Sequence, residues 1–295
     1  MINKKAVYLL GYASSMAGPG PGCGDGPLFL QESKCFADLA QSGIDLHWQL
    51  TTTPSKNDPS KLASVLRQCT LIADHVPDLI KQEKFFIVMG GDHSCAIGTW
   101  SGAQQAMQQK GPLGFIWIDA HMDSHTPQTT LTGNIHGMPL ACLLGFGEQS
   151  LINVATSMPK FNPEHICLIG IRSFEPEEEA LLKRLNVRII GMAEVQQRGL
   201  ADVMIEAIKI ATTGTVGYGL SIDIDSVDPA DAPGTDVVEA GGLSGEELCK
   251  AVQVFAHDKR LIGAEIAEFD PHRDKDQKTE KLITRLVSAI TLGIE

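Results

Sequence analysis

Short apolar segments alternate along the chain with longer segments in which apolar residues recur every three or four positions. The short segments predict β-strands over residues 6–11, 44–50, 85–89, 113–118, 165–170, 187–190, 217–224 and 261–266. The longer segments predict amphipathic helices over residues 60–81, 94–109, 176–185, 199–211, 245–257 and 275–290. Regular alternation of strands with helices is typical of an α/β fold.

Several predicted strands lack the polar alternation of a half-exposed strand, such as the run Phe-Ile-Trp-Ile over residues 115–118. Strands of this kind are covered on both faces, as in parallel sheets. We therefore predict a three-layer α-β-α fold with a mainly parallel sheet of roughly eight strands. No linker or low-complexity run divides the 295 residues, so we expect a single domain over residues 1–295.

The net charge and the cysteine pattern indicate what kind of partner and what cellular compartment to expect. The net charge of −12 argues against a nucleic-acid or membrane partner and mildly favours a small cationic substrate. The seven Cys are scattered and include no C-x-x-C pair, which indicates reduced thiols and a cytoplasmic location. The apolar run before Gly11 is too short for a signal peptide or a membrane span.

Three polar motifs follow three of the predicted strands: GGDHS at 90–94, DAHMD at 119–123 and SIDIDSVDP at 221–229. Because the carboxyl ends of parallel strands meet at one edge of a sheet, we expect these motifs to converge. Their two imidazoles and four of their six carboxylates would suit two divalent metal ions about 3.5–4 Å apart. The predicted ligands are His93, Asp119, His121, Asp123, Asp223 and Asp225.

The spacing of these residues predicts how they reach the ions. If the chain stays extended after residue 118, then Asp119, His121 and Asp123 face one point, because alternate residues share a face. Asp223 and Asp225 repeat this spacing after the seventh predicted strand.

Each aspartate taken alone can equally be the N-cap of a following helix. However, the three motifs contain no Lys or Arg. Four converging carboxylates without a cation would repel one another, so we expect bound metal. Oxygen donors with a minority of imidazoles favour Mn²⁺, while Fe, Co, Ni and Zn stay open.

The three motifs resemble those of the arginase, or ureohydrolase, family of manganese amidinohydrolases in residue type, order and spacing. The resemblance extends from GDGP at 24–27 to AEFDP at 267–271. It implies two Mn²⁺ ions per chain. His93, Asp119, Asp123 and Asp223 would hold one ion, and Asp119, His121, Asp223 and Asp225 would hold the other.

The resemblance also implies catalytic roles for His136, Glu268 and Asp123. Glu268 matches the family's guanidinium-binding glutamate, and its alternative interpretation is a surface or helix-capping residue. His136 matches the proton shuttle, a role that suits imidazole because its ordinary pKa lies near neutrality. In the same stretch, Thr132 and Asn134 would contact the substrate's α-carboxylate, although both can also be ordinary turn residues.

Departures from the family pattern lie at the substrate end of the site. His125 stands where arginases usually have Asn, and a cationic imidazole there would still bind a carboxylate. Ser173 and Glu175 stand where Asp is typical, and Glu175 keeps the charge that engages the α-amino group. Val237 lacks the hydroxyl group common at its position. The expected substrate contacts are thus His125, Thr132, Asn134 and Glu175.

We therefore expect hydrolysis of a guanidino group to urea and an amine, with L-arginine as the substrate. The alternatives are an agmatinase or guanidino-acid ureohydrolase, a formiminoglutamase-like hydrolase, and a non-catalytic metal-binding relative. The resemblance further implies a homo-oligomer, either a trimer or a hexamer.

Overall fold

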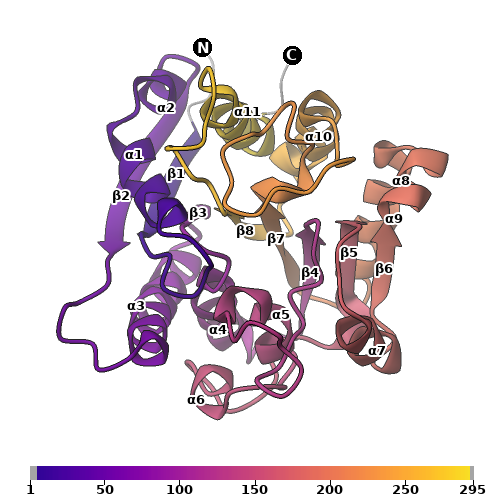
Figure 1. The fold of residues 1–295 in the computed structure, drawn as a ribbon. Coiled ribbons are helices and arrows are strands. Elements are labelled where there is room, and N and C mark those ends of the chain that lie inside the picture. Colours follow the sequence, from indigo (N-terminus) through magenta and orange to yellow (C-terminus); the bar gives the residue numbers. More distant parts are fainter. Residues whose placement is uncertain (1–4, 293–295) are drawn as a thin grey trace.

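An eight-stranded sheet forms the centre of the computed structural model, which describes residues 5–292 (Figure 1). The strands are β1 (Lys5–Tyr12), β2 (Ile44–Thr52), β3 (Phe86–Gly90), β4 (Leu113–Ile118), β5 (Ile166–Ile171), β6 (Arg188–Gly191), β7 (Gly217–Asp223) and β8 (Leu261–Ala267). Every neighbouring pair is parallel, in the order β2-β1-β3-β8-β7-β4-β5-β6. The predicted strands and their parallel pairing are confirmed.

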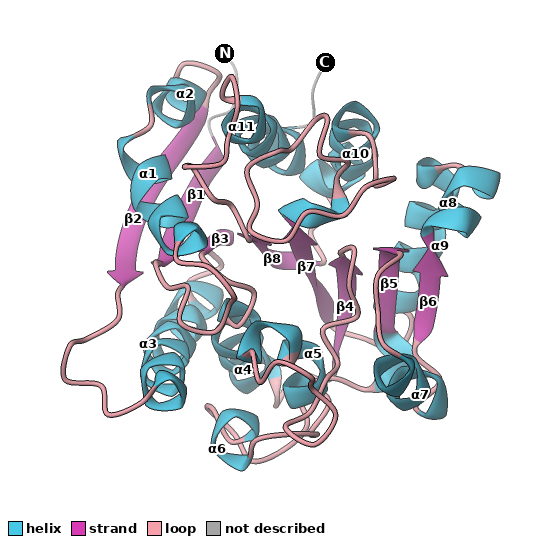
Figure 2. Cartoon of the chain, viewed as in Figure 1, coloured by secondary structure: helices cyan, strands magenta, loops and turns pink. Residues whose placement is uncertain are grey.

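Helices cover both faces of the sheet (Figure 2). The α-helices are α1 (Gly26–Glu32), α2 (Lys34–Ala37), α3 (Lys61–Lys81), α4 (Cys95–Met107), α5 (Pro139–Leu143), α6 (Gln149–Ile152), α7 (Pro176–Arg184), α8 (Met192–Arg198), α9 (Leu200–Thr212), α10 (Gly245–Val252) and α11 (Lys278–Leu292). Short 3₁₀ helices are η1 (Gly22–Asp25), η2 (Asp38–Ala40), η3 (Ile135–Gly137), η4 (Pro163–His165), η5 (Ile224–Ser226) and η6 (Gln253–His257). The three-layer prediction is confirmed.

Alternate residues of the central strand β3 enter two separate hydrophobic cores. In β3, Ile87 and Met89 belong to the core that also contains residues of α9, α10 and α11, whereas Phe86 and Val88 belong to the core that contains residues of α3 and α4. Figure 1 shows α10 and α11 on one side of the sheet and α3 and α4 on the other. Both faces are therefore buried, which explains why these strands are apolar along their whole length.

The predicted helices are present, but their ends differ from the structure, and two of these differences have a clear local cause. The predicted helix over residues 245–257 changes to the 3₁₀ helix η6 after Val252. The predicted helix over residues 199–211 begins after Gly199, whose φ of 84° separates it from α8. A positive φ suits glycine, which has no Cβ to clash.

No helix among residues 5–292 is long and apolar enough to cross a membrane. The expected single domain over residues 1–295 includes residues 1–4 and 293–295, which lie outside the described residues.

Candidate metal centre and active site

The four central strands of the sheet carry the candidate site at their carboxyl ends. Strands β3, β8, β7 and β4 lie side by side in that order. His93 follows β3, Glu268 follows β8, Asp223 ends β7, and Asp119 follows β4. The strand order therefore brings together residues that are far apart in the sequence, at the edge where open α/β sheets bind ligands.

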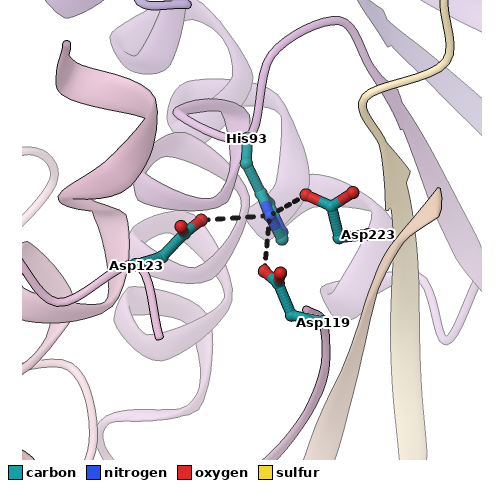
Figure 3. Close-up of side chains that lie close together, drawn as sticks. All are labelled: His93, Asp119, Asp123 and Asp223. Atoms are coloured by element: carbon teal, nitrogen blue, oxygen red, sulfur yellow. Dashed lines mark ion pairs between the residues drawn. The ribbon is translucent and has the colours of Figure 1, made fainter. Parts of the chain in front are cut away.

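One group of predicted ligands surrounds the ring of His93 (Figure 3). His93 Nδ1 lies 2.9 Å from Asp223 Oδ2, 3.2 Å from Asp123 Oδ2 and 3.3 Å from Asp119 Oδ2. All four side chains are buried. One imidazole nitrogen and three carboxylate oxygens thus converge on a small volume.

A second group lies beside the first and shares one carboxylate with it. His121 Nδ1 lies 3.0 Å from Asp225 Oδ2 and 3.5 Å from Asp119 Oδ1. Asp119 therefore directs one oxygen toward each group. Asp223 belongs to the first group only, so its implied role as a second bridging ligand stays a prediction.

The backbone reaches this arrangement differently from what the spacing predicts. Asp123 has a φ of 46°, so the chain after β4 is not extended throughout. Asp225 lies in the 3₁₀ helix η5, and its amide donates to Asp223 Oδ1. The expectation of an extended chain after both strands is therefore wrong, although the predicted ligands still come together. A non-glycine residue held at positive φ costs about 1–3 kcal/mol and is typical of functional sites.

The chemistry of the donor set fits bound metal ions. His93 Nδ1 is buried and makes no hydrogen bond of good geometry, although three carboxylates surround it. Burial, followed by the charges of Asp225 and Asp119, raises the pKa of Asp223 well above its ordinary value. Burial and the charge of Asp119 raise the pKa of Asp123 to about 6. Such a cluster is relieved by cations, and imidazole with carboxylate is a common ligand set for Mn²⁺.

The ring of His93 is held on its other sides. His93 Nε2 lies 2.9 Å from Ser221 Oγ, and that hydroxyl donates to Glu265 Oε1 at 2.8 Å. The ring stacks on Trp117 with the two centroids 4.2 Å apart, and Trp117 Nε1 donates to Asp119. These contacts direct Nδ1 toward the carboxylates, as the outer partners of a metal-binding histidine do.

Glu268 and His136 form a pair next to the first group. His136 Nδ1 lies 3.1 Å from Glu268 Oε1. The His93 amide donates to that oxygen at 2.8 Å, and the Cys23 thiol donates to Oε2 at 3.2 Å. Glu268 is buried and has a φ of 65°, so it is not a surface or capping residue.

The pair controls the protonation of His136. Burial lowers the pKa of the imidazole, but the hydrogen bond and charge of Glu268 outweigh this effect and raise the pKa to about 9. At neutral pH, His136 is therefore cationic and can donate a proton.

All four predicted substrate contacts line one cavity of about 340 Å³, which suits a small molecule. Its wall includes His125, Thr132, Asn134 and Glu175, together with the metal-ligand candidates His121, Asp123, Asp223 and Asp225. Both ring nitrogens of His125 have protein neighbours. Nδ1 lies 3.1 Å from Thr129 Oγ1, and Nε2 lies 3.0 Å from Glu175 Oε2.

Sequence reasoning missed Glu178 and Glu239 in this cavity. Glu178 is buried, accepts the Ser124 amide at 3.0 Å and forms a capping box with Glu175 at the start of α7. The Glu at the third helical position fits the usual sequence signal of such a box, but a Glu in place of Ser or Thr at the N-cap does not. Glu239 lies in an irregular loop, and its approach to His121, with Nε2 and Oε1 3.6 Å apart, has no local sequence signal.

Comparisons of the sequence and of the structure with known proteins both find members of the arginase family. The model of the arginase family matches residues 5–293. The chain is 38% identical to an arginase from Bacillus subtilis over 80% of this chain and 79% of that protein. It is 32% identical to an arginase from Brevibacillus brevis over 97% of each chain. A crystal structure of Bacillus subtilis arginase superposes with a TM-score of 0.90 at 32% identity, covering 99% of each chain.

Proposed function

The chain belongs to the arginase family of hydrolases, and from that premise we propose that it is a binuclear manganese amidinohydrolase that converts L-arginine to L-ornithine and urea. One observation carries the proposal. Two groups of potential metal ligands share Asp119, and the Glu268–His136 pair lies beside the first of them. Relatives named arginase, 30–38% identical to this chain, support the choice of substrate.

The metal ligands on this proposal are those that the structure gathers. His93, Asp119, Asp123 and Asp223 would hold the first ion. Asp119, His121 and Asp225 would hold the second, with Asp223 as the further ligand that the family resemblance implies. When bound, the two ions supply Lewis-acid activation of water near neutral pH.

Glu268 would bind and orient the guanidinium group of the substrate. A carboxylate can pair with a planar guanidinium through two parallel hydrogen bonds, which fixes its orientation. The His93 amide and the Cys23 thiol contact the two carboxylate oxygens of Glu268 and hold the group in place. Because Glu268 is buried, water does not compete for this contact.

His136 would donate a proton to the leaving amine. Its ring lines the cavity, and in the metal-free protein the hydrogen bond and charge of Glu268 raise its pKa to about 9, which favours the protonated form. An amine leaves as a neutral molecule only after its nitrogen gains a proton, and a positioned imidazole is the usual donor. Glu268 is buried, whereas 18% of the His136 side chain is exposed, so the ring can reach a substrate in the cavity.

The outer end of the cavity would bind the α-amino and α-carboxylate groups. Thr132 and Asn134 can donate to the carboxylate, and Glu175 can accept from the amino group. A second candidate substrate is a guanidino amine such as agmatine. One observation supports this candidate: among residues 5–292, the cavity wall includes Glu175, Glu178 and Glu239 but no Lys or Arg, which suits an ammonium group more than a carboxylate.

Urea release from the manganese-loaded protein tests the proposal. L-arginine, agmatine, guanidinobutyrate and guanidinopropionate would be compared side by side, with ornithine measured in the first reaction. We expect the highest kcat/KM with L-arginine. Glu268→Gln is the matched inactive control, because it keeps the shape of the side chain and removes its charge. Protein that binds two Mn²⁺ ions and releases urea from none of the four compounds would contradict the proposal.

A further inference from the structure

The two histidines of the candidate metal centre differ in how firmly the protein holds them. The His93 side chain is 1% exposed, stacks on Trp117 and has Ser221 on its far nitrogen. The His121 side chain is 23% exposed, and no aromatic ring stacks on it within residues 5–292. Packing therefore restricts the rotation of His121 less than that of His93.

Glu239 faces the far nitrogen of His121. His121 Nδ1 lies 3.0 Å from Asp225 Oδ2, so a metal ion held by these two side chains would bind Nδ1 and leave the proton on Nε2. Glu239 Oε1 lies 3.6 Å from Nε2, which is an ion-pair contact longer than a direct hydrogen bond. A carboxylate at this position favours the tautomer that leaves Nδ1 free for a metal ion.

We infer that Glu239 is a positioning residue that orients His121 for the second metal ion, an inference that rests on the proposed function in requiring metal at His121. Glu239 acts through His121 and contacts no reacting atom. Each histidine then has a serine and a glutamate on the side away from the metal site. Ser221 contacts His93 and donates to Glu265. Glu239 contacts His121 and accepts from Ser173.

The position of Glu239 is itself fixed by the segment that follows β5. Ser173 Oγ donates to Glu239 Oε1 at 3.0 Å, the same oxygen that faces His121. The Arg172 guanidinium donates to the backbone oxygen of Glu239 at 2.8 Å and to that of Asp225 at 2.6 Å. One arginine therefore connects the loop of Glu239 to the loop of a second-metal ligand.

The same segment is also tied to the loop of His121. The amides of Arg172 and Ser173 both donate to the backbone oxygen of Ala120, at 2.9 and 3.0 Å. Glu239 and His121 are thus connected to one dipeptide, which limits their relative movement. A glutamate on an unsupported loop would sample many rotamers and would orient its partner poorly.

Manganese binding to Glu239→Ala, Glu239→Gln and Ser173→Ala tests the inference without relying on activity. Chelator-treated protein would be titrated with Mn²⁺ while free Mn²⁺ is followed by electron paramagnetic resonance. In Glu239→Ala we expect the Kd of the second ion to rise about 10–100-fold and that of the first ion to stay unchanged. Glu239→Gln, which keeps an acceptor oxygen, should lose less, and Ser173→Ala should give a smaller change in the same direction.

Glu177→Gln is the charge-matched control, because it removes an exposed carboxylate of α7 that belongs to no group of potential metal ligands. Its second-ion affinity should equal that of the wild type. The inference is overturned if Glu239→Ala and Glu239→Gln both bind the second ion with wild-type affinity, or if Glu177→Gln weakens it equally. If Glu239→Ala does not fold, judged by circular dichroism, Glu239→Gln decides the question.

Wild-type titration separates this inference from the proposed function. The proposed function and the role of Glu239 both require two ions per wild-type chain. A wild-type stoichiometry of one ion would therefore overturn both of them. Two ions in the wild type, with both variants unaffected, would overturn only the role of Glu239.

Discussion

His136 Nδ1 lies 3.1 Å from Glu268 Oε1, so one buried carboxylate holds the imidazole that lines the cavity. The two residues come from different parts of the chain: Glu268 follows the central strand β8, and His136 lies in η3. The His136 amide also donates to Ala17, which fixes the backbone beside the ring. Substrate orientation and proton donation would therefore depend on a single contact.

Replacement of this imidazole should slow turnover without removing metal. We expect His136→Ala to lower kcat by about 10²–10⁴-fold, the usual contribution of a positioned acid or base. Metal content, measured by elemental analysis, should stay at the wild-type value because His136 is in neither ligand group. His257→Ala, at an exposed position in η6, is the control. A kcat for His136→Ala equal to that of the control would exclude the proton-donor role.

Loss of a metal ligand, unlike loss of His136, should weaken metal binding. Asp225→Asn removes a charged ligand from the second group only. Loss of an outer partner of a metal ligand weakens binding by up to about 100-fold, so loss of the ligand itself should weaken binding of the second ion at least that much. Turnover should fall severely at limiting Mn²⁺. The same change at Asp202, exposed in α9, should affect neither quantity. Unchanged metal affinity in Asp225→Asn would show that the ligand assignment is wrong.

Metal binding should stabilise the fold, because it neutralises buried carboxylates. At Mn²⁺ concentrations near 100 times the Kd, linkage predicts a gain of about 2.7 kcal/mol per site in the free energy of unfolding. Thermal unfolding of chelator-treated protein with and without Mn²⁺ measures this gain. Ca²⁺ prefers larger, all-oxygen sites and should give much less. An equal shift with Ca²⁺ would mean that the site does not select by ligand type.

The His136–Glu268 pair predicts a pH dependence in the metal-free protein. The pKa of His136 is about 9 in the folded protein, against about 6.5 when unfolded, so the folded state binds its proton more tightly. The resulting stabilisation is complete below about pH 6.5 and is lost as pH rises through about 9. Denaturant unfolding should show wild type about 2 kcal/mol more stable than His136→Ala at about pH 6. If that difference persists at about pH 10, the pair does not titrate as described.

Thiol reactivity should separate one cysteine from the rest. Cys35 is partly exposed, whereas the other six cysteines are buried. Burial is the main cause that raises the pKa of Cys142 to about 12 and of Cys249 to about 11. Burial and the charge of Glu280 also raise the pKa of Cys35, so its access to the reagent is what distinguishes it. We therefore expect one fast-reacting thiol per native chain and seven after denaturation. Cys35→Ser should remove the fast phase, and a fast phase that survives would place the reactive thiol elsewhere.

The strands could be predicted from sequence because their signal is local. Each buried strand is a short apolar run, and β4 is predicted with the same bounds that the structure shows. The convergence of His93, Asp119 and Asp223 also follows from the sequence, since parallel strands align their carboxyl ends. Short helices such as α5 and α6 could not be predicted, because four or five residues provide too little periodicity.

The details of the site depended on contacts that sequence spacing does not encode. The left-handed φ of Asp123 is imposed by its surroundings, so the extended geometry expected from residue spacing failed. Cys23 reaches Glu268 across 245 positions of sequence, and Glu239 reaches His121 from an irregular loop. Such contacts arise only when the sheet order brings separate loops together.

Two of the candidate functional residues, Asp123 and Glu268, lie at positive φ. Glycine would adopt these backbone angles with less strain, but Glu268→Gly would also lose the stabilising pair with His136. At Asp123, whose buried carboxylate lies beside that of Asp119, glycine would relieve both strain and repulsion in the metal-free protein. Directed evolution that selects for heat resistance alone should therefore accumulate inactive clones at Asp123. A screen for a more robust biocatalyst needs turnover as a second criterion, or a library that leaves this codon unchanged.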